Sequence, residues 1–503
     1  MKIQGEKMRP GTRFFMPVLA LVVLCVSCQP GGPVNGENPG DDTPPQQGET
    51  YGIPAETAPP ADPAYPDEGI FISPAGNDEN ADGTPEAPFR TIQHVLDHIA
   101  GAGDTLILRG GIYNEAVRVR RPNITIRSKH DEWARIICPL DDEDNYAIAV
   151  EFDVDASGSR LQRLAVAGAY YYGISFETKW DWGEADRGGA SGILVENCII
   201  HHTGRDSVKI KPGCDDITIR NCEIHHSGFR DNGNAEGIDN VNGDRTTIVD
   251  CHIHDTATTG IYLKGGATGC VVNRCLVEDC GSGGILLGFD TSPEYFDTAA
   301  NPGYYENING MVKNCVVRNT YYAGIGLFAA RNARVYHNTI IDTATSGEHS
   351  PIYFGITLQD WDTDINGRPA SINPVIQNNI VFQSAHLEAA LVEIRSFFHD
   401  SLGRVNGLEG PAQMNANCYW GGSGLFRDNR PGLEFSGNLG QWRTHMGAEA
   451  LSIMADPLFT NGFDLSVQSP CIDAGLQLGA VATDYYGRIR IPPADMGAVE
   501  YQP

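Results

Sequence analysis

The phrase Asn197-Cys198-Ile199-Ile200 recurs along the middle of this chain and decides its fold. It returns, with the cysteine kept or replaced, as Asn221-Cys222-Glu223-Ile224, Asp250-Cys251-His252-Ile253, Arg274-Cys275-Leu276-Val277, Asn314-Cys315-Val316-Val317, Asn338-Thr339-Ile340-Ile341 and Asn378-Asn379-Ile380-Val381. Successive offsets are 24, 29, 24, 40, 24 and 40 residues, so the base period is 24 with insertions. Self-similarity at a fixed period predicts an architecture of stacked repeats.

A second run in each repeat is aligned on Gly-Ile-x-Leu, as in Gly237-Ile238-Asp239-Asn240 and Gly260-Ile261-Tyr262-Leu263. Strict alternation of apolar and variable positions over such a short run indicates a half-buried strand. Two or three short strands per turn, parallel to those above and below, describe an all-β fold, the right-handed parallel β-helix. Each coil of such a solenoid contacts only its neighbours, so 503 residues can form one long domain.

The two flanks of the repeats differ from the middle. Near one end lies Phe71-Ile72-Ser73-Pro74-Ala75-Gly76-Asn77-Asp78, and near the other Asp495-Met496-Gly497-Ala498-Val499-Glu500. Both resemble the flanking modules of exported bacterial β-helix proteins of the pectate-lyase-like superfamily, a resemblance that implies the fold and leaves the chemistry open. We expect an N-terminal cap and first coils over 68–130, with a helix from Thr91 to Ile99. The core would then span 131–410, and C-terminal coils and a closing module 411–503.

The N-terminus has the features of an export signal. Four basic residues precede an apolar run, Phe14 to Val26, that is too short to span a membrane. Cys28 after Ser27 resembles a bacterial lipobox, which implies a signal peptide over 1–28 and lipidation of Cys28; an ordinary secretory signal is the alternative. Residues 29–67, rich in Pro, Gly, Asp and Glu, are expected to form a disordered acidic linker. We therefore expect a monomeric lipoprotein at a bacterial outer membrane or cell surface.

The net charge limits the binding partners to be expected, and the spacing of the cysteines indicates whether they form disulfides. A formal charge of -28 argues against nucleic acid and makes a cation such as Ca²⁺ the more natural companion. Five of the 13 cysteines share one register of the repeat between apolar neighbours, which favours a column of buried free thiols. Bridging between rungs stays open, and Cys418 with Cys471 is the first candidate for a true disulfide.

Outward positions of the Gly-Ile-x-Leu strand carry charge on three consecutive coils. They read Asp206, Lys209 and Lys211, then Glu236, Asp239 and Val241, then Thr259, Tyr262 and Lys264. Rungs lie about 4.8 Å apart, so these acids could converge on one Ca²⁺. A lysine near a cation is pushed toward the neutral form that a general base requires. This combination suits β-elimination from a uronic acid.

The same residues resemble the site of the family nine pectate lyases. That family uses Asp-Asp-Gly-x-Asp, an earlier Asp and a later lysine; here Ala235-Glu236-Gly237-Ile238-Asp239 follows Asp206 and precedes Lys264. The resemblance implies Asp206, Glu236 and Asp239 as calcium ligands and Lys264 as the base, although Ala235 replaces one acid. We expect Lys209, Lys211 and Arg245 to contact substrate carboxylates. An exposed ladder of ion pairs, Asp206 with Lys209 or Lys211 and Asp239 with Lys264, is the alternative.

Histidines form another outward column, His201, His225 and His254. They could bind a transition metal or contact an anionic sugar, or they could simply stack in contact with solvent at the edge of a coil, which is the alternative that we favour. The doublets His201-His202 and His225-His226 lack the spacing of a known zinc motif, so we assign them no metal role. We place His225 and His254, with Tyr262, among the substrate contacts.

Aromatic residues gather in the inserted loops and could serve as platforms for sugar rings or simply cover the β-helix. They include Trp180, Trp182, Tyr295, Phe296, Tyr304, Tyr305 and Trp361 of Gln359-Asp360-Trp361-Asp362. The sequence thus predicts a surface-anchored lyase that cleaves an acidic, uronate-containing polysaccharide with the help of Ca²⁺. A glycoside hydrolase on the same fold and a non-catalytic glycan-binding lipoprotein are the alternatives.

Overall fold

The computed structural model describes residues 47–180, 188–358, 367–400 and 402–502. The chain divides into two units, Met1–Asp41 and Asp42–Pro503, and every described residue belongs to the second. The predicted signal peptide and Cys28 lie outside the described residues. Among the residues that are described, no helix is both long and apolar enough to cross a bilayer.

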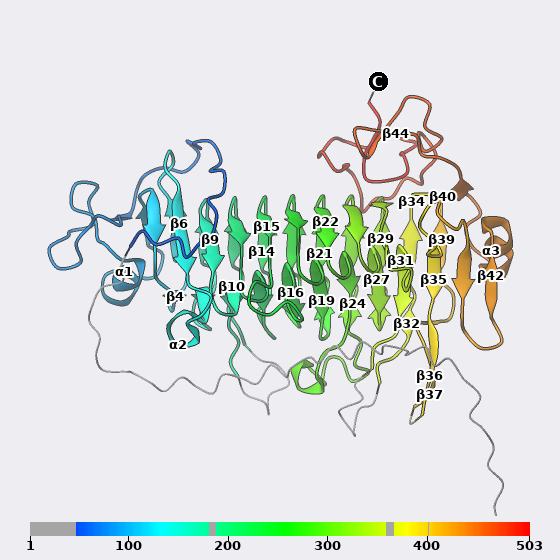
Figure 1. The fold of residues 1–503 in the computed structure, drawn as a ribbon, viewed down its shortest axis with the longest axis horizontal. Coiled ribbons are helices and arrows are strands. Elements are labelled where there is room, and N and C mark those ends of the chain that lie inside the picture. The colour runs from blue at the N-terminus through cyan, green and yellow to red at the C-terminus, as the bar shows by residue number, and fades with distance from the viewer. Residues whose placement is uncertain (1–46, 181–187, 359–366, 401, 503) are drawn as a thin grey trace, which may run out of the picture. The chain divides into compact units, whose positions relative to one another are not determined.

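Three long sheets form the walls of a parallel β-helix (Figure 1), and the chain visits them in turn on each coil. Sheet A contains β1 (Ile70–Ile72), β2 (Thr105–Leu108), β5 (Thr125–Ser128), β8 (Arg160–Gln162), β11 (Leu194–Glu196), β14 (Thr218–Arg220), β17 (Thr247–Val249), β21 (Val271–Asn273), β25 (Met311–Lys313), β29 (Arg334–Tyr336), β33 (Val375–Gln377) and β39 (Gln413–Asn415).

Sheet B follows sheet A on each coil. It contains β3 (Gly111–Tyr113), β6 (Ala134–Cys138), β9 (Ala165–Gly168), β12 (Ile199–His201), β15 (Glu223–His225), β18 (His252–His254), β22 (Leu276–Cys280), β26 (Val316–Thr320), β30 (Thr339–Ile341), β34 (Ile380–Gln383), β40 (Cys418–Gly421) and β43 (Ile453–Met454).

Sheet C completes the coil. It contains β4 (Val117–Val119), β7 (Ile148–Phe152), β10 (Tyr172–Phe176), β13 (Val208–Ile210), β16 (Ile238–Val241), β19 (Ile261–Lys264), β23 (Ile285–Leu287), β27 (Ile325–Phe328), β31 (Ile352–Gly355), β35 (Val392–Ile394), β41 (Phe426–Asp428) and β42 (Phe435–Gly437). Only the last pair in sheet C, β41 with β42, is antiparallel within these three described sheets.

Shorter strands fill the corners of the coils. A fourth parallel sheet consists of β20 (Ala267–Thr268), β24 (Asn307–Ile308), β28 (Ala330–Arg331), β32 (Ser371–Ile372) and β38 (Leu408–Glu409). Two antiparallel pairs are β36 (Ser396–His399) with β37 (Gly403–Asn406), and β44 (Phe459–Thr460) with β45 (Asp464–Leu465).

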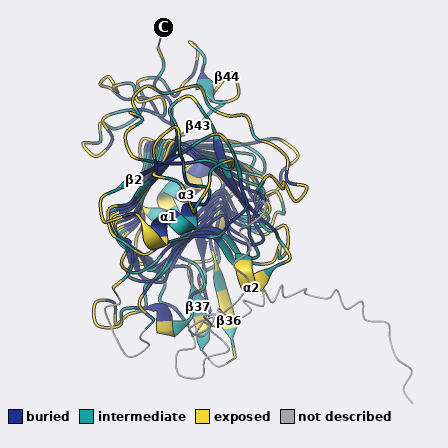
Figure 2. Ribbon diagram, turned by 90° about the vertical axis from the view of Figure 1, so that its left-hand side faces the viewer, coloured by how far each residue is buried: buried dark blue, intermediate teal, exposed yellow. Residues whose placement is uncertain are grey.

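The interior of the coils is packed with the alternating apolar residues that the repeat predicts. In Figure 2 most strands of the three long sheets are coloured as buried, and exposed residues gather on loops, end caps and the pair β36 with β37. The cysteines of the repeat are buried free thiols, as predicted. Asparagines continue their column: Asn338 Nδ2 donates to Asn379 Oδ1 at 3.0 Å, and Asn379 Nδ2 to Asn417 Oδ1 at 3.0 Å.

The expected Cys418–Cys471 disulfide is wrong for this structure, in which both residues are buried free thiols. The two thiols are nevertheless neighbours. A hydrogen bond with Cys471, together with burial, raises the pKa of Cys418.

Helices cover both ends of the stack. The predicted helix near Thr91 is confirmed as α1 (Ile92–His98), which buries Ile92, Val95 and Leu96. At the other end α3 (Leu439–Met446) begins with a capping box formed by Asn438 and Gln441. The two remaining described helical turns are α2 (Glu143–Tyr146) and the 3₁₀ turn η1 (Pro293–Tyr295). Such caps cover the open edges of a solenoid.

Residues 47–67, which the sequence assigns to a disordered linker, lie against the β-helix. Ile53 is buried, and Glu56 accepts hydrogen bonds from Trp133 Nε1 at 2.7 Å and Arg135 Nε at 2.9 Å. His130 lies 2.6 Å from Asp67. The linker prediction is therefore wrong for this stretch, because a few anchoring contacts hold a segment whose composition alone predicts disorder.

Candidate functional site

Outward positions on sheet C form a column in which each residue lies beside its counterpart on the next coil. The register pairs Lys209 with Asp239 and Asp239 with Tyr262. The next two rungs carry Leu286 and Gly326 at the same position. The charges on β13, β16 and β19 therefore lie side by side on one face. The same column also carries Arg118 and Glu151 on earlier rungs, and Glu393 and Arg427 on later rungs.

Three carboxylates and two lysines meet there in what we call the acid–lysine cluster: Asp206, Lys209, Glu236, Asp239 and Lys264. Lys209 Nζ lies 3.2 Å from Asp206 Oδ2 and forms a second ion pair with Asp239 Oδ2. Lys264 Nζ lies 3.4 Å from Asp239 Oδ1. None of the five is more than 7% exposed. The ion pairs of the alternative interpretation are thus present, but they are buried, and the small stabilisation typical of surface pairs does not describe them.

Glu236 and Asp239 have pKa values that are shifted in opposite directions by their surroundings. Burial, with the charges of Asp206 and Asp239, holds the pKa of Glu236 well above its usual range. Burial also acts to raise the pKa of Asp239, but the ammonium groups of Lys209 and Lys264 outweigh it and lower that pKa. Of these two acids, Glu236 is therefore the one that keeps its proton to higher pH, and Asp239 is the carboxylate that the two lysines stabilise.

Polar neighbours that sequence reasoning missed hold Glu236 in place. Thr258 Oγ1 donates to Glu236 Oε1 at 2.9 Å, and the Glu236 amide donates to Asp206 Oδ1 at 3.2 Å. With its amide nitrogen turned toward Glu236, Asn234 donates to Oε2 at 3.3 Å and accepts from Arg205 at 2.7 Å. These residues come from turns that precede sheet C, and no periodic pattern marks them.

Aromatic residues lie on those same turns. The Arg230 guanidinium is 3.8 Å from the ring centre of Tyr170 and 5.0 Å from that of Tyr171. Phe229 is 53% exposed, and Tyr172 lies 5.7 Å from the Lys209 ammonium. The Tyr170-Tyr171-Tyr172 run was the available sequence signal, and it lies one coil before Lys209.

The described aromatic residues of the inserted loops are buried or partly buried. Tyr295 and Phe296 are buried, and the Arg368 guanidinium lies 4.9 Å from the Phe296 ring centre. Tyr304 and Tyr305 are partly buried. Trp180 contacts Tyr295, with ring centres 6.0 Å apart. Trp182 and Gln359-Asp360-Trp361-Asp362 lie outside the described residues.

Two predicted lysine and tyrosine contacts share the outer face of sheet C with the cluster. Lys211 forms an ion pair with Glu177, and its ammonium lies 5.7 Å from the Trp180 ring centre. Tyr262 is buried beside Lys264, whose ammonium is 4.5 Å from the Tyr262 ring centre. The Tyr262 ring stacks on Phe289 at 5.0 Å.

Three other predicted substrate contacts lie elsewhere on the coil. Arg245 precedes β17 of sheet A, where it pairs with Asp216 at 2.7 Å and Asp215 at 3.1 Å. His225 and His254 end strands of sheet B. Burial and the charges of neighbouring imidazoles lower the pKa of His225 to about 3, so this ring is neutral and does not attract an anionic sugar by charge. The structure does not bring these three residues to the acid–lysine cluster, because they lie beside sheets A and B whereas the cluster lies on sheet C.

The acids of the cluster have the chemistry of a Ca²⁺ site. One oxygen from each of Asp206, Glu236 and Asp239 lies within 4.8 Å of the others, and Ca²⁺ prefers such carboxylate ligands. The Lys209 ammonium already contacts two of these acids. The residues therefore fit Ca²⁺ in ligand type and spacing, with Lys209 as a competing cation.

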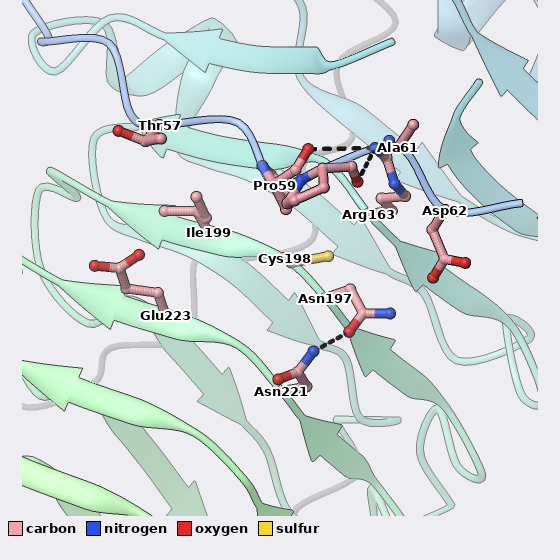
Figure 3. A pocket seen from close by; sticks show the side chains of 11 residues that line it. Thr57, Pro59, Ala61, Asp62, Arg163, Asn197, Cys198, Ile199, Asn221 and Glu223 are labelled. Carbon is pink, nitrogen blue, oxygen red and sulfur yellow. Dashed lines mark hydrogen bonds between the residues drawn. The ribbon is translucent and has the colours of Figure 1, made fainter. Parts of the chain in front are cut away.

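A separate hollow lies beside sheet B (Figure 3). Its volume is about 460 Å³, and it lies between residues 57–62 and the strands that follow Asn197 and Asn221. Arg163, which bridges the two sides, donates to Pro60 O at 2.8 Å. No residue of the acid–lysine cluster lines this hollow.

Comparison with known proteins bears on the fold. A family model described as "Right handed beta helix region" matches residues 154–295. Pectate lyase Pel9A is 15% identical, with 86% of this chain and 97% of that chain covered and a TM-score of 0.51. The complex of XylC with xylose is 11% identical, covers 86% and 98%, and has a TM-score of 0.52. These similarities confirm the predicted right-handed parallel β-helix, and at such identities they establish the fold alone.

One curated relative also matches. "Uncharacterized protein YwoF" of Bacillus subtilis (strain 168) is 38% identical over 68 residues, which span 12% of this chain and 14% of that protein.

Proposed function

We propose that this right-handed parallel β-helix protein is a polysaccharide lyase that cleaves a uronate-containing polysaccharide by β-elimination. One observation carries the proposal: five charged side chains from three consecutive rungs are buried together on the outer face of sheet C. Burying charge costs free energy, and a chain that only needed a stable wall could place apolar residues there, as it does on the next rungs.

Lys264 is the proposed base. It and Lys209 form ion pairs with opposite oxygens of the same Asp239 carboxylate. A Ca²⁺ ion bound to that carboxylate would, together with the Lys209 ammonium, repel the charge on Lys264 and favour the loss of its proton. The neutral amine of Lys264 would take the proton from C5 of the uronate. The C5 electron pair forms the C4–C5 double bond as the glycosidic bond at C4 breaks, and the departing oxygen is protonated by solvent.

The other charges are proposed to hold the sugar acid. Lys209 and Lys211 occupy neighbouring outward positions on the same run and would pair with substrate carboxylates. Ca²⁺ held by Asp206, Glu236 and Asp239 would neutralise the uronate carboxylate and stabilise the enolate-like charge. On the turns before sheet C, Tyr170, Tyr171 and Phe229 offer rings on which neighbouring sugars can stack.

The spacing of the acids supports elimination over inverting hydrolysis. An inverting glycosidase separates its two carboxyl groups by about 6.5–9.5 Å to admit a water molecule. Here one oxygen of each acid lies within 4.8 Å of the others, and the Lys209 ammonium contacts both Asp206 and Asp239. The acids are thus closer together than inverting hydrolysis requires, and the Lys209 ammonium lies between two of them.

We also propose the setting in which the enzyme works. The basic and apolar N-terminus suits export, and Cys28 suits a lipid anchor on a bacterial outer membrane or cell surface. The net charge of -28 would repel both nucleic acid and a polyuronate, so a cation would be needed to bring an acidic polysaccharide to this monomer.

Incubation with a panel of polyuronates and glycosaminoglycans, with Ca²⁺ or with a chelator, tests the proposal. The expected result is ultraviolet absorbance from unsaturated uronate on at least one substrate, lost in chelator. New reducing ends without that absorbance would indicate hydrolysis instead. Binding without any cleavage product would leave a glycan-binding protein and refute both enzymatic readings.

A further inference from the structure

Six histidines line the outer face of sheet B on three consecutive rungs: His201, His202, His225, His226, His252 and His254. Their rings are stacked from coil to coil. The ring centres of His201 and His225 are 5.0 Å apart, and those of His225 and His254 are 4.8 Å apart. The proposed lyase chemistry on sheet C uses none of them.

On each of these three rungs, two atoms that could ligate a metal face one another. His201 Nδ1 lies 2.8 Å from His202 Nδ1, and His225 Nδ1 lies 2.7 Å from His226 Nδ1. On the third rung His254 Nδ1 lies 2.7 Å from Asp255 Oδ2. Two adjacent ligands of one zinc ion stand about 3.0–3.4 Å apart, as bond lengths near 2.1 Å require. Small rotamer changes would therefore let such a pair bind one ion.

We propose that His226, His254 and Asp255 bind a divalent transition-metal ion such as Zn²⁺. Their ligand atoms lie within 4.8 Å of one another across two rungs. Two imidazoles and one carboxylate are a donor set that Zn²⁺, Ni²⁺ and Cu²⁺ accept, and water completes the coordination.

The neighbourhood of His254 favours this ligand set. His254 Nε2 lies 3.2 Å from Glu223 Oε1, so the nitrogen that faces away from the proposed ion meets a carboxylate. Metal-bound histidines characteristically donate their second N–H to such a group, which fixes the ring and its tautomer. Glu223 is thus a positioning residue in this site.

The site lies in an uncovered window of sheet B. On one side Glu56 of the N-terminal segment reaches His201, with Oε2 3.3 Å from Nε2. On the other side Ala498 and Val499 of the C-terminal module pack against Val316 of β26. Figure 1 shows these two covers on either side of β15. Ions can therefore reach the rungs of β15 and β18, and the side chains of Glu223 and Asp255 are 44% and 48% exposed.

Another triad shares His254, namely Glu223, His252 and His254. In that set His252 would be a ligand, whereas His252 Nε2 already lies 2.8 Å from Glu278 Oε1, which also pairs with Arg318. The two assignments predict different effects on Zn²⁺ binding. If His226 is a ligand, a change at His252 leaves the affinity unaltered; if His252 is a ligand, a change at His226 does so.

Isothermal titration of the untagged full chain with Zn²⁺, in the presence of Ca²⁺ to occupy oxygen-only sites, tests the proposal. We expect one site, with His226→Asn and His254→Ala each weakening binding by more than about tenfold, and Glu223→Gln by about 10- to 100-fold. Asparagine is chosen at position 226 because the backbone there has φ 55°, which asparagine tolerates. His252→Ala and the exposed His386→Ala are matched controls expected to bind Zn²⁺ normally.

Absence of Zn²⁺ binding to the wild-type chain would overturn the proposal. So would full affinity in His226→Asn, or a loss in His252→Ala with binding retained in His226→Asn. Circular dichroism of each variant confirms that the β-helix is intact, so that a loss of binding reports a lost ligand.

Discussion

Replacing Asp239 and Glu236 separately by their amides distinguishes the roles of two acids in the same buried cluster. Asp239→Asn and Glu236→Gln each remove one carboxylate with little change in shape. Asp239 holds two lysine ammonium groups, whereas Glu236 is the acid whose pKa is raised by burial and by its acidic neighbours. In chelator, we therefore expect the two variants to differ strongly in stability.

The magnitude follows from the partners that each variant leaves behind. Asp239→Asn removes the carboxylate that lies 3.4 Å from the Lys264 ammonium and one of the two ion pairs of Lys209, whose contact with Asp206 at 3.2 Å is kept. Removing one partner of a buried ion pair costs about 3–5 kcal/mol. Glu236→Gln keeps a neutral group that can accept from Thr258, so we expect a change of less than about 1 kcal/mol at pH 5.

The dependence on pH has opposite signs for the two acids. The folded-state pKa of Glu236 is raised, so between the ordinary glutamate pKa and that raised value the unfolded chain loses a proton that the folded chain keeps. Stability then falls by up to about 1.4 kcal/mol per pH unit as pH rises, and Glu236→Gln removes this slope. The folded-state pKa of Asp239 is lowered, so its contribution is present above the ordinary aspartate pKa and is lost as pH falls through the lowered value.

Urea unfolding followed by far-ultraviolet circular dichroism, in chelator at pH 5 and pH 8, measures these differences. Equal destabilisation by the two variants at pH 5, or a Glu236→Gln protein that retains the wild-type loss of stability between pH 5 and pH 8, would refute the proton distribution derived above.

Three further predictions concern Lys209, Arg205 and the cysteines of the repeat. Lys209→Met removes the ammonium that contacts Asp206 and Asp239, so calorimetry should show tighter Ca²⁺ binding; unchanged affinity would mean that Lys209 does not compete with the ion. Arg205→Met removes the donor to Asn234, and we expect weaker Ca²⁺ binding through Glu236 with folding retained; an unaltered affinity would remove Arg205 from the support of the site. The cysteines of the repeat are buried free thiols, so a thiol reagent should label them only after unfolding, and rapid labelling of the native protein would contradict the packed column.

Much of the architecture could be predicted because a β-helix repeats its own geometry. The cysteine phrase sets the register of sheet B, and the Gly-Ile-x-Leu run sets that of sheet C. Side chains alternate across a strand, so Asp239 and Lys264 could be placed on the same outer face from spacing alone. The helix near Thr91 likewise followed from local periodicity.

Contacts between distant segments could not be predicted in this way. The anchoring of residues 47–67 depends on single partners such as Glu56 with Arg135, 79 positions apart along the chain. Arg245 occupies a charged position near the cluster in sequence, but the turn before β17 directs it to Asp216. Nor does periodicity show that an N-terminal segment and a C-terminal module leave one window of sheet B uncovered.

The central claim, that Lys264 is the base of an eliminating lyase, is tested most directly by one rate. The wild-type protein and Lys264→Ala are compared with Ca²⁺ on the polyuronate that the panel identifies, by the ultraviolet absorbance of unsaturated uronate. Lys129→Ala, on the first coils, serves as a lysine control, and circular dichroism confirms folding. We expect Lys264→Ala to lose about 10²- to 10⁴-fold in rate, as removal of a general base does, while Lys129→Ala stays near the wild-type rate. A folded Lys264→Ala protein that releases unsaturated products at the wild-type rate would contradict the account.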